Sequence, residues 1–212
     1  MKVGVLGTGD VGKALGNGFL ALGHEVKLGS RDAGKAGAWA KAAGGRASAG
    51  SFAETAAFGE VLVLATLGVA ATQTLDLAGP QHFKDKLVID TTNPLDFSAG
   101  FPPRLAITGY DSGGEQIQRA LPGARVVKAW NTVGHAHMFR PQFPDGPPDM
   151  FICGNDAAAK QQMKGILDQF GWGTVDVGNI EAARYLEAMC LVWVLYGASG
   201  NTWNHAFKLL RK

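Results

Sequence analysis

A glycine-rich turn stands between an apolar strand and a helical pattern near the start of the chain. The run Val3–Leu6 predicts a buried strand, and the sequence GTGDVG, residues 7–12, follows it directly. Apolar side chains then recur at helical spacing from Val11 to Leu22. A strand, a GxGxxG turn and a helix in this order form the context in which the motif binds a dinucleotide.

Each glycine of the turn has its own physical reason. Gly7 permits the tight turn, Gly9 lets the backbone approach a pyrophosphate, and Gly12 lets the helix pack closely on the strand. The free N–H groups and the positive dipole end of the helix then attract the phosphates. A P-loop is the alternative, because Lys13 follows Gly12, but Ala14 lacks the hydroxyl that would hold magnesium.

Short apolar runs alternate with longer helical patterns through the first two thirds of the 212 residues. This alternation predicts an α/β fold with parallel strands joined by crossover helices. Strands are expected at Lys2–Leu6, Glu25–Leu28, Arg46–Ser48, Val61–Ala65, Leu87–Asp90, Arg125–Ala129, Met150–Cys153 and Thr174–Val177. Helices are expected over Val11–Leu22, Ala33–Ala43 and Asp156–Phe170, and as two further helices after Ile180.

The pattern divides the chain into residues 1–178, which form the nucleotide-binding domain, and residues 179–212, which form a small C-terminal helical part. The run Leu186–Leu195 is apolar on nearly every side. We therefore expect this helix to be buried, and a homodimer would bury it.

Charge and apolar content exclude several classes of partner. The chain has 20 basic and 18 acidic residues, scattered rather than clustered, so no nucleic-acid binding is expected. The uncharged stretch Ala188–Ala206 is too polar to cross a bilayer, so no membrane contact is expected. A strand begins right after Met1 and Lys2 without a signal peptide, which predicts a cytoplasmic location. Cys153 and Cys190 lie in apolar surroundings and are expected to be buried thiols.

The end of the second strand favours NADP over NAD. An acidic side chain there would bind the ribose hydroxyl of NAD and repel a 2′-phosphate. Here Gly29 leaves room, Ser30 can donate a hydrogen bond, and Arg31 and Lys35 supply positive charge. The alternative is that Arg31 and Lys35 are solvated and that Asp32 is an ordinary helix N-cap.

Four segments resemble one known family, the NADPH-dependent reductases of the deazaflavin coenzyme F420 and their bacterial dinucleotide-binding relatives. They are residues 1–32, with LGHEVKLGSRD at the end, DTTNP at 90–94, KAWNTVG at 128–134 and AFKLL at 206–210. The ferric reductases of the STEAP group are similar in their nucleotide-binding part but continue into a membrane domain. One departure is Ala65–Gly68, where many relatives carry a proline followed by a bulky residue.

The resemblance implies a doubly wound Rossmann fold with a mostly parallel sheet, and a hydride passing directly between the nicotinamide and a second cofactor. NADP(H) is the expected cofactor, with coenzyme F420 or a flavin as the second. The implied site residues are Thr8, Gly9, Asp10 and Val11 at the pyrophosphate, Ser30, Arg31 and Lys35 at the 2′-phosphate, Thr66 and Leu67 at the ribose, Asn93 and Pro94 beside the nicotinamide, and Ala129, Asn131 and Ala136 beneath it.

Direct hydride transfer needs orientation of two rings rather than a catalytic side chain, so no catalytic residue and no metal are expected. If the small-molecule acceptor is a carbonyl or an imine, a histidine could donate a proton, and the candidates are His135, His137 and His205. The aromatic residues Trp130, Trp172, Trp193, Tyr196, Trp203 and Phe207 form either a stacking wall or core and interface. The loop Phe97–Gly109, with Arg104, is where substrate contacts are expected.

Three hypotheses follow. The first is an NADP(H)-dependent oxidoreductase that passes hydride between NADPH and a deazaflavin, a flavin or a related two-electron acceptor. The second is an NADPH-dependent imine or carbonyl reductase, although the pyrroline-carboxylate reductases have a longer helical dimerisation domain than the residues after Ile180 provide. The third is an NADP(H)-binding redox sensor without turnover.

Overall fold

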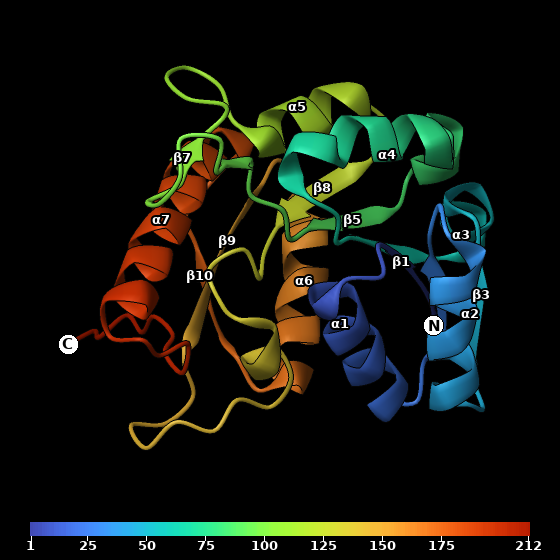
Figure 1. The fold of residues 1–212 in the computed structure, drawn as a ribbon, viewed down its shortest axis with the longest axis horizontal. Helices are drawn as coiled ribbons and strands as arrows, with labels where there is room; N and C mark the ends of the chain where they lie inside the picture. Colours follow the sequence, from blue (N-terminus) through green and yellow to red (C-terminus); the bar gives the residue numbers. More distant parts are fainter.

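The centre of the protein is an eight-stranded sheet with helices on both faces (Figure 1). The computed structural model describes residues 1–212 except for the side chain of Ala33. The strands of this sheet are β1 (Lys2–Leu6), β2 (Glu25–Gly29), β3 (Ala47–Gly50), β4 (Val61–Leu64), β5 (Leu87–Asp90), β8 (Arg125–Lys128), β9 (Asp149–Gly154) and β10 (Gly173–Asp176). A separate two-stranded hairpin is formed by β6 (Leu95–Asp96) and β7 (Arg104–Leu105).

The helices fill the connections between these strands. The described α-helices are α1 (Asp10–Ala21), α2 (Ala33–Ala43), α3 (Phe52–Phe58), α4 (Ala71–Ala78), α5 (Gly113–Ala120), α6 (Ala157–Phe170) and α7 (Ala183–Ser199). Short 3₁₀ turns are η1 (Gly68–Ala70), η2 (Pro80–Phe83), η3 (His135–His137) and η4 (Ile180–Ala182).

The strand order β10-β9-β8-β5-β4-β1-β2-β3 confirms the predicted doubly wound fold. From β1 the chain moves outward to β2 and β3, and it then returns to β4 on the other side of β1. In the eight-stranded sheet, paired strands are parallel except for β8 and β9, which are antiparallel. The reversal between β1 and β4 is a topological switch point, and ligands bind at the carboxyl ends of the strands beside such a point.

Two clusters of buried side chains join the helices to the sheet. One cluster packs α1 and α6 on one face, where Phe19 and Phe170 are buried in edge contact. The other packs α3, α4, α5 and α7 on the opposite face, where Leu75, Ile117 and Leu186 are buried. The central strands are buried from both sides, which explains why they read as continuous apolar runs in the sequence.

Helix α3 lies close to the sheet, and this explains two glycines. A Cβ atom at Gly4 would lie 2.5 Å from the carbonyl oxygen of Thr55 on α3. A Cβ atom at Gly29 would lie 2.7 Å from the Thr55 hydroxyl oxygen. Gly29 is thus required for packing against α3, which is a different reason from the space for a phosphate that the sequence suggested.

The end of the chain differs from the prediction of two helices. The single helix α7 ends at Ser199, and residues 202–212 form no regular element. Asn201 has a φ of 45°, a left-handed conformation that a continuing helix does not allow. The tail instead pairs beside β9, where the Asp149 N–H donates to the Phe207 carbonyl at 2.9 Å.

The run Leu186–Leu195 of helix α7 is also less buried than predicted, since Val192 and Leu195 are exposed. Nowhere in the described part of the chain is a helix both long and apolar enough to span a membrane. The proposed division at residue 178 stays a prediction. Cys153 and Cys190 are buried free thiols, as predicted, and burial raises the pKa of each to about 12.

Candidate functional site

A cleft of about 710 Å³ opens at the carboxyl ends of β1, β4 and β5. It lies at the topological switch point, and the turns after β1, β2, β4 and β5 form its walls. The predicted site residues that line it are Gly7, Thr8, Gly9, Asp10, Val11, Ser30, Arg31, Thr66, Leu67 and Asn93. The structure thus gathers these segments, which are distant in sequence, around one cavity.

Other predicted site residues lie outside the cleft lining. Gly12 and Ala129 are buried in the packing between helix and sheet, and Pro94 and Asn131 are buried behind Asn93. Lys35 on α2 and Ala136 on η3 are exposed to solvent.

The glycine turn presents bare backbone to the cleft. Gly7 has a φ of 132°, in the region that favours glycine, and a Cβ atom there would collide with the Ala65 carbonyl. A Cβ atom at Gly12 would collide with the Gly7 carbonyl. At Gly9, in contrast, a Cβ atom would meet nothing within 4 Å, and no side chain caps the start of α1. The free N–H groups of the first helical turn are therefore available to an anion.

The turn after β2 holds Ser30 and Arg31 at the other end of the cleft. Asp32 faces the helix rather than the cleft, because its carboxylate accepts hydrogen bonds from Gly34 N at 2.9 Å and Lys35 N at 3.4 Å. The N-cap interpretation of Asp32 is therefore confirmed. The Asp32 N–H donates to Ser30 Oγ at 2.9 Å, which fixes the Ser30 hydroxyl at the cleft edge.

The turn after β4 contacts the turn after β5 through backbone atoms. A Cβ atom at Gly68 would collide with the Asn93 carbonyl, so the two turns approach as closely as glycine allows. This contact accounts for the glycine at position 68. Thr66 lines the same wall, and its hydroxyl oxygen is buried without a hydrogen-bond partner. An unpaired buried hydroxyl is costly unless a ligand completes it.

The turn after β5 forms the floor of the cleft with Thr91, Thr92 and Asn93. Thr91 Oγ1 donates to the Leu64 carbonyl at 2.9 Å, which ties the floor to β4. Asn93 Nδ2 donates to the Asn131 carbonyl at 2.7 Å, and Asn131 Nδ2 donates back to Asn93 Oδ1 at 3.0 Å. Asn131 thus supports Asn93 from behind.

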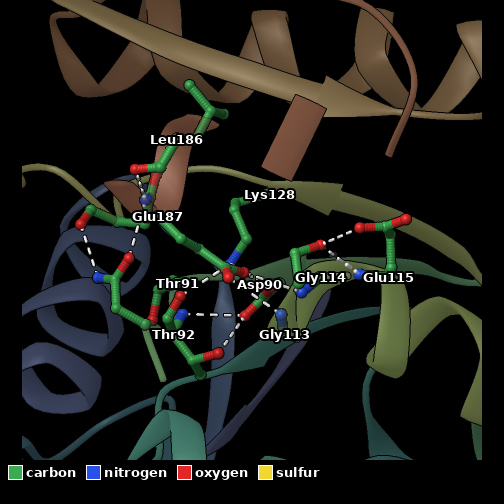
Figure 2. Close-up of polar contacts among 12 residues, drawn as sticks. Asp90, Thr91, Thr92, Gly113, Gly114, Glu115, Lys128, Leu186 and Glu187 are labelled. Atoms are coloured by element: carbon green, nitrogen blue, oxygen red, sulfur yellow. Dashed lines mark hydrogen bonds and ion pairs between the residues drawn. The ribbon is translucent and has the colours of Figure 1, made fainter. Parts of the chain in front are cut away.

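A buried group of charges lies beneath this floor (Figure 2). Lys128 Nζ lies 2.6 Å from Asp90 Oδ2 and 3.1 Å from Glu187 Oε1, and all three side chains are almost completely buried. Lys128 also donates to the Thr92 carbonyl at 2.7 Å. The backbone N–H groups of Gly113 and Gly114 donate to the two oxygens of Glu187.

Burial alone would lower the pKa of Lys128, but the carboxylates of Asp90 and Glu187 offset this effect and hold the pKa above its usual 10.5. The lysine is therefore charged at neutral pH, and three oxygens lie within 3.1 Å of its Nζ atom. Sequence reasoning missed this group as a unit. A usable signal was present, since a charged residue ends each of the apolar strands LVID and RVVK.

Comparison with known proteins identifies the family. The family described as "NADP oxidoreductase coenzyme F420-dependent" matches residues 2–94. The F420-dependent NADP reductase of Methanocaldococcus jannaschii is 32% identical over 203 residues, which cover 89% of both chains. The chain belongs to the F420-dependent NADP reductase family. This membership places it among the NADP-dependent oxidoreductases and confirms the resemblance drawn from the sequence.

Two further proteins are similar to this chain. A solved structure assigned as an F420-dependent NADP reductase, from Arthrobacter sp. FB24, superimposes with a TM-score of 0.94 at 38% identity and covers 100% of both chains. The metalloreductase STEAP3 of Rattus norvegicus is 27% identical over 199 residues. Those residues are 90% of this chain but only 36% of STEAP3, so the chain spans about a third of that relative.

The residues of this reductase fit a dinucleotide. The open space at Gly9 and the uncapped start of α1 suit a pyrophosphate, and the unpartnered hydroxyl of Thr66 offers a hydrogen bond. Arg31 lies at the cleft end where the 2′-phosphate of NADP is expected. Within the residues described, no three side chains of His, Cys, Asp or Glu gather into a metal site.

The histidines and tryptophans of the reductase differ in position. His135 lines the cleft, whereas His137 contacts Asn204 Oδ1 at 3.1 Å and His205 stacks on Trp193. Trp130 and Trp172 are buried in the core, so the core alternative holds for them. The aromatic side chains that line the cleft are Phe52 and Phe97, and Arg104 lies outside the lining.

Proposed function

We propose that this chain transfers a hydride between NADPH and the deazaflavin coenzyme F420. The observation that carries the proposal is the single cleft that joins the Gly9 turn and Arg31 to the Thr91–Asn93 floor. The cleft is long enough to hold the phosphates against the backbone of the Gly9 turn and the nicotinamide ring against the polar floor. Family membership supports the same reaction, since curated relatives with similar length act on F420 and NADP by name.

NADPH would supply the hydride, and the protein would bind and orient it. The first turn of α1 would hold the pyrophosphate, and Ser30 and Arg31 would hold the 2′-phosphate. Leu67, Val69 and Phe97 give one side of the cleft an apolar surface, which would exclude water from the reacting rings. Asn93, fixed by Asn131, would set the depth at which the nicotinamide lies.

Replacing Arg31 with alanine tests the 2′-phosphate assignment. We expect the NADPH Kd to rise roughly 10- to 100-fold, because a charge-assisted hydrogen bond contributes about 1.5 to 3 kcal/mol. The affinity for NADH, which lacks the phosphate, should not change. Titration of each nucleotide by calorimetry measures both values.

Lys41→Ala is the matched control, because Lys41 is an exposed cation in the last turn of α2 and lies outside the cleft lining. Its NADPH affinity should stay within about twofold of wild type, as expected of an exposed charge. Equal NADPH and NADH affinities in the wild type would show that the proposed cofactor preference is wrong.

The acceptor can be identified by measuring the fall in NADPH absorbance with F420, free flavin, a ferric chelate and a cyclic imine in turn. The imine or carbonyl reductase is the second candidate, because His135 lines the cleft where it could protonate such a substrate. This candidate predicts that the imine oxidises NADPH and that the rate of this oxidation is lost in His135→Ala. Binding of NADPH without oxidation by any acceptor would favour the redox sensor.

A cytoplasmic homodimer also stays a proposal. The exposed residues Tyr185, Val192 and Tyr196 on α7 support it, because they are large apolar or aromatic side chains on one helix. Light scattering should give twice the 22.2 kDa of one chain. Tyr185→Glu should then shift the mass to that of a monomer, and a monomeric wild type would contradict the dimer.

A further inference from the structure

Glu187 of α7 reaches the cleft floor through Lys128 (Figure 2). Lys128 has three N–H groups and three close oxygens, on Asp90 at 2.6 Å, Thr92 at 2.7 Å and Glu187 at 3.1 Å. Asp90 in turn accepts the Thr92 N–H at 2.9 Å and the Thr92 hydroxyl at 2.7 Å. Both backbone polar groups of Thr92 are therefore bonded to this buried group, and Thr92 lines the cleft.

Leu186, the neighbour of Glu187, reaches the floor by a second route. Its carbonyl accepts a hydrogen bond from Asn131 Nδ2 at 2.9 Å. The same amide nitrogen donates to Asn93 Oδ1 at 3.0 Å, and Asn93 also lines the cleft. Two consecutive residues of α7 are thus connected to two consecutive residues of the floor.

The position of Glu187 is itself fixed from the side of α5. Gly113 N donates to Glu187 Oε2 at 3.0 Å, and Gly114 N donates to Oε1 at 2.9 Å. The carboxylate therefore connects the start of α5, the helix α7 and Lys128. In a buried, low-dielectric site such directional bonds are strong, so a change at Glu187 is transmitted to Thr92 rather than absorbed by water.

We propose that Glu187 and Asn131 are positioning residues, through which α7 holds Thr92 and Asn93 in place against the bound nicotinamide. This inference rests on the proposed NADPH-dependent hydride transfer. Neither side chain touches the reacting atoms, and both act through the floor residues. The C-terminal helix then determines the geometry of the reaction while the Gly9 turn and Arg31 determine cofactor affinity.

Glu115 provides a matched control on the same pair of helices. It is also buried, and it joins α5 to α7 through Arg184, whose Nε donates to it at 2.8 Å. Its other side-chain partner is Ser112, at 2.7 Å, and none of these residues lines the cleft. A purely structural role for buried ion pairs between α5 and α7 predicts similar effects at Glu115 and Glu187.

The first test is hydrogen exchange on the protein without nucleotide, which does not depend on turnover. In Glu187→Gln the amide N–H₂ group cannot accept a backbone N–H, and the charge facing Lys128 is lost. We expect the peptide containing Thr92 to exchange at least about tenfold faster than in wild type, as local opening allows. In Glu115→Gln this peptide should exchange at the wild-type rate.

The second test separates rate from binding. We expect kcat with F420 to fall about tenfold or more in Glu187→Gln, since misplacement by an ångström costs up to about 100-fold. The NADPH Kd should stay within about threefold, because the phosphate contacts are distant from the floor. Asn131→Ala should reproduce both results, and it serves if Glu187→Gln does not fold.

Equal exchange and equal kcat in the Glu187 and Glu115 variants would overturn the inference. A loss of NADPH affinity that matches the loss of kcat would also overturn it. If none of the tested acceptors supports NADPH oxidation by the wild type, the proposed function fails. The exchange rates of the Thr92 peptide then still decide whether α7 holds the floor.

Discussion

Lys128→Met is expected to lower the free energy of unfolding by about 3 to 5 kcal/mol, the usual cost of removing one partner from a buried ion pair. The methionine would leave the carboxylates of Asp90 and Glu187 buried without their cation. It would also leave the Thr92 carbonyl without its donor. Urea unfolding followed by circular dichroism measures the change.

A triple variant supplies the control, with Asp90→Asn and Glu187→Gln added to Lys128→Met. Removing all the charges together should recover part of the lost stability, because no uncompensated ion is then buried. If the free energy of unfolding of Lys128→Met lay within about 1 kcal/mol of wild type, the buried ion group would be contradicted, since an exposed ion pair contributes on that scale.

The same group predicts the response to alkaline pH. The folded pKa of Lys128 is above the usual 10.5, so its contribution to stability is fully present below pH 10.5 and is lost as the pH rises through the folded value. As the pH rises above 10.5, the free energy of unfolding of the wild type should therefore fall more steeply than that of Lys128→Met.

Gly9→Val is expected to weaken NADPH binding by at least about 100-fold and to leave the fold intact. The added side chain would occupy space in which a Cβ meets no protein atom within 4 Å, and that is where the pyrophosphate would lie. Two lost charge-assisted hydrogen bonds at about 1.5 kcal/mol each give this factor. Calorimetric titration and thermal unfolding measure the two quantities.

Gly12→Ala should show the opposite pattern. Its Cβ would collide with the Gly7 carbonyl, and overpacking of this kind costs about 1 to 3 kcal/mol. A loss of stability in Gly9→Val as large as that in Gly12→Ala would contradict separate roles for the two glycines. Unchanged NADPH affinity in a folded Gly9→Val would contradict the cofactor site.

The strands of the eight-stranded sheet and the glycine turn could be predicted because their causes are local. After Lys2, strand β1 carries no polar side chain, as a strand covered on both faces requires. Helix α3 was missed because it is short, and its capping box between Ser51 and Glu54 is a weak signal without the sheet beneath it. The end of α7 was missed because apolar Trp203 and Phe207 resemble a helical pattern, whereas Asn201 turns the chain away.

The site was predicted unevenly for a similar reason. Residues in or beside a motif, such as Arg31 and Asn93, could be placed at the cleft from the sequence. Asp90 and Lys128 each end an apolar strand, which is a usable signal for each of them alone, but Glu187 comes from a late helix. Their meeting depends on tertiary packing, which no spacing in the sequence encodes.

The contact between Gly68 and the Asn93 carbonyl has a consequence for how the cleft can evolve. Two turns that touch through their backbones keep the same separation whichever side chains surround them. Substitutions at Leu67, Val69 or Phe97 can therefore change the chemical character of the cavity, while its width stays constant. A larger residue at position 68 would force the two turns apart, so a change in the width of the cavity would begin there.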